Sequence, residues 1–123
     1  VQGEISLTEV AAQMRHSDAL LLFSRYENFP CVIAEAWSSG IPVLSSDVGG
    51  ISEHLTDNRG ALVQSEDVAE LAQTMHARIL QEQTFDGHAL RAHATDCFSV
   101  AAIAKAYGEA YHTALNTGKP DVK

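Results

Sequence analysis

The chain has 123 residues, 46% of them hydrophobic and 20% charged, which fits one soluble globular domain or a piece of one. Its 16 acidic and 8 basic residues give a formal net charge of -8, so the anionic backbone of a nucleic acid would be repelled. The chain contains no run of about 18 apolar residues that could span a membrane, and its two cysteines and six histidines lack the spacing of a metal site. We therefore expect a cytoplasmic location, no nucleic-acid partner and no metal.

The first third of the chain alternates helix and strand signals. Ser6 and Glu9 form the S-x-x-E pattern of a capping box, which predicts a short helix. The run from Ala19 to Phe23 is apolar at every position and therefore predicts a parallel strand that is covered on both faces. A second helix is expected to have Pro30 in its first turn and to stop at Ser39-Gly40.

Two further strands complete the predicted sheet. The strand Pro42–Ser46 opens with a proline, which is tolerated at the first position of a strand. Gly49-Gly50 precedes a short helix that runs through Leu55, and the third strand is Ala61–Gln64. Strands that alternate with helices predict an α/β fold. We expect three parallel strands flanked by helices, a partial Rossmann-like arrangement.

Three helices are predicted after the third strand. The first is capped by residues 65–67, the second runs from 85 to about 93, and the third is capped by Ser99. Helical spacing predicts that two sets of apolar residues face inward: Val68, Leu71, Ala72, Met75 and Ile79 on the first helix, and Val100, Ile103, Ala104, Tyr107, Tyr111 and Leu115 on the third. Residues 119–123 are expected to form a disordered tail.

The loop Ser24–Pro30 is the candidate binding site. In open parallel sheets, ligands bind beyond the carboxyl ends of the strands, where loops lead into helices. The first turn of the following helix offers unpaired N–H groups and the positive end of the helix dipole, which suit a diphosphate. Because Pro30 has no N–H, the expected donors are the amides of Phe29, Cys31 and Val32.

Two carboxylates bracket this turn. Glu27 lies just before the helix, where it could hold the hydroxyls of a sugar, and Glu35 lies eight residues later. The helix face that carries Glu35 also carries the small residues Cys31, Ala34 and Ser38, so a ligand could approach the carboxylate. A fixed carboxylate accepts hydrogen bonds from paired hydroxyls such as a ribose diol.

The stretch from Ser24 to Gly60 resembles the donor-site signature of family 4 glycosyltransferases, which have the two-lobed GT-B fold. Three features match in order: the Glu-x7-Glu pair within ENFPCVIAEA, the segment Ser39–Val43, and Asp47–Glu53. Each feature alone is weakly specific, whereas the three together at these spacings are specific. The resemblance implies that the chain is the C-terminal half of the Rossmann-like, donor-binding domain.

The resemblance also implies roles for the candidate residues. Glu35 would grip the ribose of the nucleotide, and Glu27 would be the catalytic residue that contacts the donor sugar. Main-chain amides from Asn28 to Val32 would hold the diphosphate. The enzyme would transfer a hexosyl group from a UDP-, GDP- or ADP-sugar with retention of anomeric configuration, and the resemblance implies neither a metal nor another cofactor.

Parts of the family pattern are absent from this sequence. The glycine-rich first loop and the basic pair that neutralises the pyrophosphate have no counterpart here. A glycan or lipid acceptor would bind through the missing N-terminal lobe. The full-length enzyme would be free in the cytoplasm or peripheral to the inner face of the membrane. We therefore expect residues 1–118 to be part of a larger domain that is inactive alone. The first strand, left without a neighbour, would pair with a second copy and form a homodimer.

Several candidate residues also have purely structural interpretations. Gly49 and Gly50 would either permit a tight turn or let the backbone approach the donor sugar. Arg25 is a candidate phosphate ligand at a position that the family pattern does not fix, and solvation alone would explain it. Trp37 lies on the expected inner face of its helix, which indicates packing rather than ligand binding.

Two other classes of protein share this size and fold. A signalling receiver domain needs an acidic pair after its first strand, where this chain has Ser24-Arg25. A non-catalytic assembly or nucleotide-binding module would dimerise without ligand, and the sequence leaves this alternative open.

Overall fold

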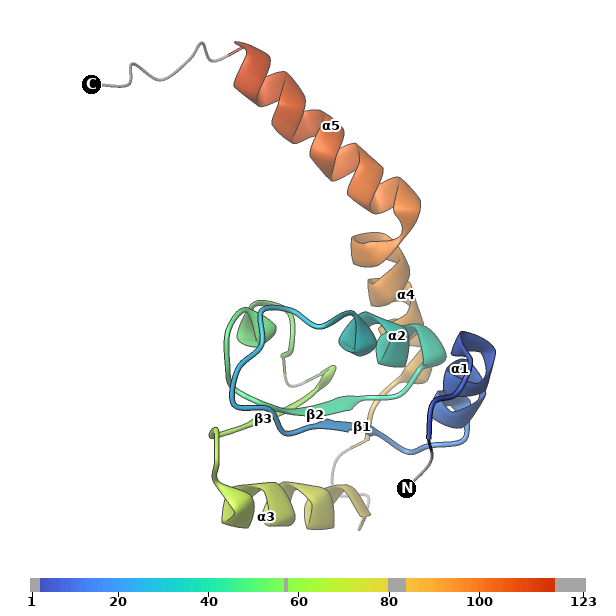
Figure 1. The fold of residues 1–123 in the computed structure, drawn as a ribbon, viewed down its shortest axis with the longest axis vertical. Coiled ribbons are helices and arrows are strands. Elements are labelled where there is room, and N and C mark those ends of the chain that lie inside the picture. Colours follow the sequence, from blue (N-terminus) through green and yellow to red (C-terminus); the bar gives the residue numbers. More distant parts are fainter. Residues whose placement is uncertain (1–2, 57, 80–83, 117–123) are drawn as a thin grey trace, which may run out of the picture.

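The computed structural model describes residues 3–56, 58–79 and 84–116, which Figure 1 shows in sequence colours. The elements in chain order are α1 (Leu7–Arg15), β1 (Leu20–Leu22), α2 (Cys31–Ser39), β2 (Val43–Ser46), the short 3₁₀ helix η1 (Ile51–Glu53), β3 (Gly60–Val63), α3 (Val68–Ile79), α4 (Gly87–Phe98) and α5 (Val100–Asn116). Within the described residues, the strands form one parallel sheet in the order β1-β2-β3. The predicted α/β fold with three parallel strands flanked by helices is confirmed.

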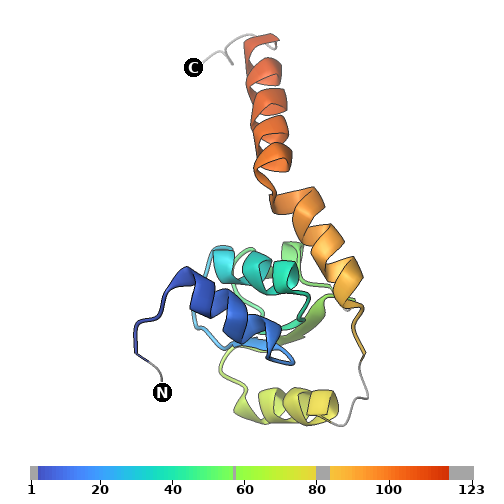
Figure 2. The ribbon, with the colours of Figure 1, turned by 90° about the vertical axis from the view of Figure 1, so that its right-hand side faces the viewer.

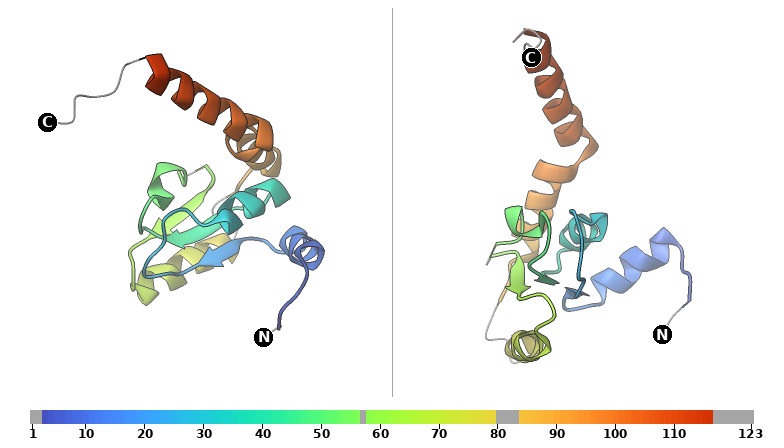
Figure 3. Two further views of the ribbon diagram at one scale, coloured as in Figure 1. Left: turned by 45° about the horizontal axis from the view of Figure 1, so that its top comes forward. Right: turned by 60° about the vertical axis from the view of Figure 1, so that its left-hand side comes forward.

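The strand β2 lies at the centre of this sheet. Its residue Leu44 is in register with Leu21 of β1 and with Ala61 of β3. All four residues of β2 are buried. The helix α2 lies over one face of the sheet and α3 over the other, as Figures 1 and 3 show. The central strand is therefore covered on both faces, as is usual for parallel sheets.

The core lies between β2 and the inner face of α2. Ile33, Ala36 and Trp37 are fully buried on that face. The indole N–H of Trp37 donates a hydrogen bond to the main-chain oxygen of Arg59 at 3.0 Å. The helix α4 packs along α2 and adds the fully buried Leu90 to the same core (Figure 2). The predicted packing role of Trp37 is confirmed.

Local sequence sets the ends of the helices. The amide of Ser6 donates to Glu9 Oε2 at 2.8 Å and the amide of Glu9 donates to Ser6 Oγ at 3.3 Å, so the predicted capping box is present. Gly40 ends α2 with a φ of 81°, in the left-handed region that favours glycine. The helix α4 begins later than predicted, because Asp86 accepts hydrogen bonds from its first amides, and it continues to Phe98.

The prediction that the first strand is covered on both faces is wrong. Leu20 and Leu22 pack against the core, whereas Leu21 is 44% exposed. Leu21 faces the side of the sheet that α3 covers, and α3 packs mainly on β3 at the far side of the sheet. An unbroken apolar run therefore marks this strand without ensuring that both of its faces are buried.

The inward face predicted for the last helix is also wrong. Val100 is 88% exposed and Leu115 is 80% exposed, and Ile103, Tyr107 and Tyr111 between them are exposed as well. Figures 1 and 3 show α5 running away from the sheet after α4. Helical spacing predicts an apolar stripe, but it contains no information about which part of the molecule covers that stripe.

The inward face predicted for α3 is covered only in part. Val68 and Met75 are exposed, while Leu71 is half-buried. The side chain of Ile79 and the predicted tail 119–123 lie outside the described residues. Among the described residues, every helix is too short or too polar to span a membrane.

Two Leu→Ala variants test this distribution of burial. Leu90→Ala should lower the free energy of unfolding by about 2–5 kcal/mol, because it opens a cavity in the core. Leu115→Ala on the exposed stripe of α5 should change it by less than about 0.5 kcal/mol. Urea unfolding of both variants measures the difference, and equal losses would contradict the described position of α5.

Candidate functional site

The candidate loop lies at the carboxyl edge of the sheet, between β1 and α2. Beside it lies the loop that follows β2. The amide of Gly50 donates a hydrogen bond to the main-chain oxygen of Asn28 at 2.8 Å. Gly49 has a φ of 59°, and a Cβ at this position would overlap the carbonyl oxygen of Glu27. The two glycines thus bring two loops into contact. The sequence analysis considered only a tight turn or an approach of the backbone to the donor sugar, and it did not include this role.

The first turn of α2, which follows the candidate loop, has no side-chain cap. Pro30 is the N-cap of the helix rather than part of its first turn, and its backbone is extended (φ -73°, ψ 132°). The amide of Ile33 donates to the main-chain oxygen of Pro30 at 3.1 Å. The amides of Cys31 and Val32 precede it, at the positive end of the helix. The helix end therefore has the properties that an anion requires.

Glu27 is held by a residue that the sequence analysis did not single out. The hydroxyl of Ser24 donates a hydrogen bond to Glu27 Oε1 at 3.0 Å, and the Glu27 side chain is half-buried. Asn28 is exposed, and its side-chain oxygen accepts a weak hydrogen bond from the hydroxyl of Tyr26 at 3.5 Å. A serine three residues before the carboxylate was the available sequence signal for this contact.

Glu35 is exposed on the outer face of α2 and lines a cavity of about 780 Å³. The small residues Cys31, Ala34 and Ser38 line the same cavity, so the expected access to the Glu35 carboxylate is present. Helices α1 and α4 form most of the other walls, mainly with apolar side chains that include Phe98, and Phe29 and Ile103 of α5 complete them. Glu27 is not among the described residues that line this cavity. Phe29, two residues after Glu27, does line it, so the loop that carries Glu27 borders the cavity.

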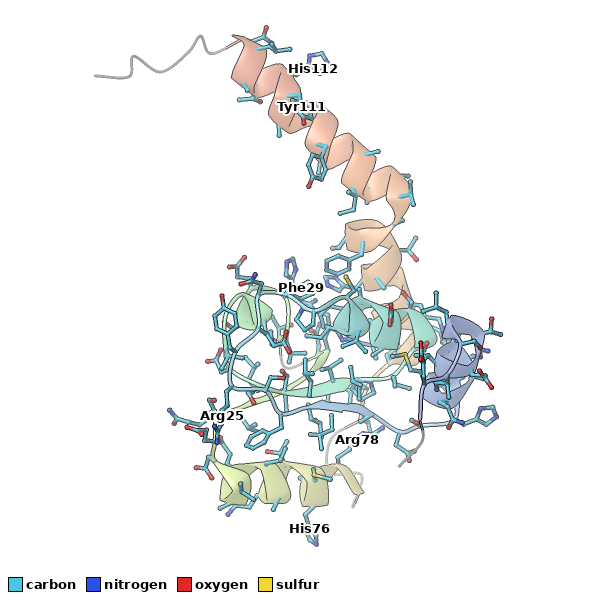
Figure 4. The ribbon with its side chains drawn as sticks, viewed as in Figure 1. Arg25, Phe29, His76, Arg78, Tyr111 and His112 are labelled. Atoms are coloured by element: carbon cyan, nitrogen blue, oxygen red, sulfur yellow. The ribbon has the colours of Figure 1, made fainter. Side chains whose placement is uncertain are left out.

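Arg25 points away from the start of α2. Its Nε atom lies 2.8 Å from Glu66 Oε1, in an ion pair whose two side chains are largely exposed. Figure 4 shows Arg25 on the α3 side of the sheet, whereas Phe29 lies on the α2 side. An exposed pair of this kind contributes little to stability. The structure thus pairs Arg25 with Glu66, and its role as a phosphate ligand stays a prediction.

Phe29 is packed among rings from three other parts of the chain. Its centroid lies 4.7 Å from that of His54 after η1, 5.3 Å from that of Phe98 at the end of α4, and 6.3 Å from that of Trp37. The Phe98 ring is nearly parallel to that of Phe29, with 17° between the planes. The sequence analysis missed both His54 and Phe98, because these contacts join segments that are far apart in the chain.

His93 belongs to the core behind these rings. Its ring lies edge-on to that of Trp37 at 5.2 Å, and its Nε2 atom is buried without a hydrogen-bond partner. Burial lowers the pKa of His93 below its ordinary value; the charges of Arg59 and His54 lower it further, while Asp96 raises it. His93 is therefore neutral at neutral pH. Among the described residues, no three His, Cys, Asp or Glu side chains lie together to hold a metal ion.

Comparison with known proteins gives consistent matches. The family described as "Glycosyl transferases group 1" matches residues 1–81. D-inositol 3-phosphate glycosyltransferase of Streptomyces avermitilis is 32% identical over an alignment 123 positions long, gaps included, which covers 94% of this chain and 25% of that protein. Glycogen synthase of Mycobacterium tuberculosis is 37% identical over 71 residues, which cover 57% of this chain and 17% of that protein.

A solved structure has the same fold. Sucrose-phosphate synthase of Thermosynechococcus elongatus superimposes with a TM-score of 0.81 at 26% identity, covering 95% of this chain and 30% of that one. The predicted Rossmann-like arrangement of the GT-B kind is confirmed. The chain spans less than a third of the length of each of these three proteins.

Two Gly→Ala variants test the contact between the loops. Gly49→Ala should destabilise the chain by at least about 1–2 kcal/mol, because its φ is positive and the new methyl group would meet the carbonyl of Glu27. Gly108→Ala, in α5 with open space around it, should instead stabilise by about 0.5–1 kcal/mol. Thermal unfolding reports both effects. A Gly49→Ala variant as stable as the parent chain would refute the described contact.

Proposed function

Because the chain belongs to the group 1 glycosyl transferases, we propose that it is the C-terminal half of the donor-binding domain of a family 4 retaining glycosyltransferase. The enzyme would transfer a hexosyl group from a UDP-, GDP- or ADP-sugar to an acceptor. One observation carries this proposal: α2 begins without a side-chain cap, directly after the loop that holds Glu27, and Glu35 lines the cavity along its outer face.

The start of α2 is the proposed diphosphate site. The amides of Phe29, Cys31 and Val32 would donate hydrogen bonds to the phosphate oxygens. As the glycosidic bond to the diphosphate breaks, negative charge grows on the leaving phosphate, and the positive end of the helix dipole would stabilise it. This electrostatic role needs no metal ion from the protein. The exposure of Cys31 and Asn28 leaves room for the ligand to approach.

Glu35 is the proposed ribose ligand. Its carboxylate is exposed at the wall of the 780 Å³ cavity, among small side chains that leave space for a nucleoside. An ionised carboxylate has only acceptor sites, so it pairs naturally with the two donor hydroxyls of a ribose.

Glu27 is the proposed catalytic contact with the donor sugar. The hydrogen bond from Ser24 restricts the rotamers of Glu27, and the Gly50–Asn28 contact fixes the backbone beside it. A carboxylate held in this way loses little conformational entropy when it accepts hydrogen bonds from sugar hydroxyls.

The proposed site is incomplete within residues 1–118. We propose that the acceptor, a glycan or a lipid, binds to a separate N-terminal lobe, and that basic residues outside this sequence neutralise the diphosphate. The relatives named above differ in the product that their names describe, so they single out no acceptor. The isolated chain should therefore transfer little or no sugar. A cytoplasmic location, free or at the inner face of the membrane, belongs to the same proposal.

Calorimetric titration of the chain with UDP, GDP and ADP tests the donor site. We expect one nucleotide to bind, and Glu35→Gln to raise its Kd about tenfold, because a hydrogen bond to a charged group is lost. The control is Glu109→Gln, an exposed glutamate on α5, which should leave the Kd unchanged. Equal affinities for Glu35→Gln and the parent chain would contradict the ribose role, and the absence of binding by all three nucleotides would count against a donor site in this chain.

We also propose that the chain forms a homodimer through β1. In the described sheet β1 is an edge strand, so one row of its backbone N–H and C=O groups lacks a strand partner, and Leu21 beside it is exposed. Pairing of two β1 strands across a two-fold axis would satisfy these groups. Dimerisation with no nucleotide binding would favour the alternative, a non-catalytic assembly module.

Light scattering at high concentration measures this association. We expect a dimer for the parent chain and a monomer for Leu21→Lys, because a lysine blunts a strand edge. Leu115→Lys serves as the matched control on the exposed stripe of α5 and should remain dimeric. A monomeric parent chain would refute the proposal, and a dimer lost only in Leu115→Lys would move the interface to α5.

A further inference from the structure

We propose that Phe98, the last residue of α4, is a positioning residue for the loop Ser24–Pro30, called the donor loop below. Phe98 acts through its stacking contact with Phe29. This inference rests on the proposed function, which makes this loop part of the donor site. The contact between Phe98 and Phe29 can be tested without a ligand. The juxtaposition joins the last residue of α4 to the residue that immediately precedes the N-cap of α2.

The ring of Phe29 attaches the loop to the core. Phe29 packs against the core, whereas its neighbours Tyr26 and Asn28 are exposed. The nearly parallel Phe98 ring lies 5.3 Å from it, and His54 lies 4.7 Å away at a tilted angle. Aromatic pairs have preferred relative orientations. The contacts with Phe98 and His54 therefore fix the direction of the Phe29 side chain as well as burying it. The direction of Phe29 in turn sets the backbone from which Glu27 and the first amides of α2 project.

The rings behind Phe29 are themselves held in place. The guanidinium of Arg59 lies 5.9 Å from the centre of the Trp37 ring, and Arg59 Nε donates to the main-chain oxygen of His54 at 2.7 Å. The main-chain oxygen of Arg59 accepts the indole hydrogen bond of Trp37. His54 and Trp37 are therefore linked through one residue. Phe98 contacts both rings, at 5.3 Å and 6.1 Å, and enters the cluster from α4.

Phe98 also adjoins the bend between α4 and α5. Ser99 separates the two helices with an extended backbone, and its hydroxyl accepts a hydrogen bond from the amide of Ala102 at 3.2 Å, which caps α5. A change in the angle between the helices would therefore act on the residue next to Phe98. The stacking contact would transmit that change to Phe29, so the proposal links the orientation of α5 to the geometry of the donor loop.

The test compares Phe98→Leu with Phe85→Leu, which removes a half-buried ring that also packs against the core but makes no ring contact with Phe29 in the described structure. The readout is hydrogen exchange at the amide of Gly50, which is bonded to Asn28 in the loop. Exchange should be about three- to tenfold faster in Phe98→Leu than in Phe85→Leu, the factor expected from loss of an aromatic pair. Phe98→Tyr, which keeps the ring, should restore the parent rate.

A second readout is the Kd of the nucleotide that the parent chain binds, which should rise by the same factor in Phe98→Leu and return in Phe98→Tyr. Because Phe98 also lines the cavity beside Glu35, faster Gly50 exchange in the absence of nucleotide is what distinguishes positioning from direct contact with the ligand. Equal Gly50 exchange in Phe98→Leu and Phe85→Leu would overturn the inference, even if nucleotide binds. If no nucleotide binds to the parent chain, the proposed function fails, while the exchange rates still decide the role of Phe98. Should Phe98→Leu not fold, Phe98→Met supports the same comparison, because its unbranched, flexible side chain adapts to the space that the ring leaves.

Discussion

The burial of one face of α2 against β2 is the constraint on which the candidate site depends. Ile33, Ala36 and Trp37 occupy that face, and burying each large apolar side chain contributes roughly 1.5–3 kcal/mol. Their burial fixes the rotation of the helix. The opposite face must then present Glu35 to the cavity, and the start of the helix must lie at the carboxyl edge of the sheet beside Glu27. The same packing that stabilises the fold thus orients Glu35 and sets the position of the helix start beside Glu27.

Where the information is local, the sequence predicts this structure well. The capping box at Ser6, the stop at Gly40 and the alternation of strands with helices each involve residues close together in the chain, and each is confirmed. The face argument for Glu35 also succeeds, because helical geometry alone places it with small neighbours. The assigned roles of Glu27 and Glu35 in donor binding are predictions.

What the sequence could not supply are contacts between distant segments. Nothing near Gly49 in the chain indicates that its missing Cβ makes room for the carbonyl of Glu27, and nothing near Phe29 indicates the ring of Phe98. The exposure of Leu21 and of the α5 stripe has the same origin, because periodicity identifies an apolar face without its partner. In folded proteins, an exposed apolar surface such as this stripe of α5 is usually covered by another chain or domain.

The central claim is that a donor diphosphate binds at the start of α2, and the most direct test is a ¹H–¹⁵N chemical-shift titration with UDP, GDP and ADP. We predict that one nucleotide shifts the amides of Phe29, Cys31 and Val32 most strongly, with Glu35 and its neighbours in the cavity next. Largest shifts around the Arg25–Glu66 ion pair, on the other side of the sheet, or no shifts along α2, would contradict the account.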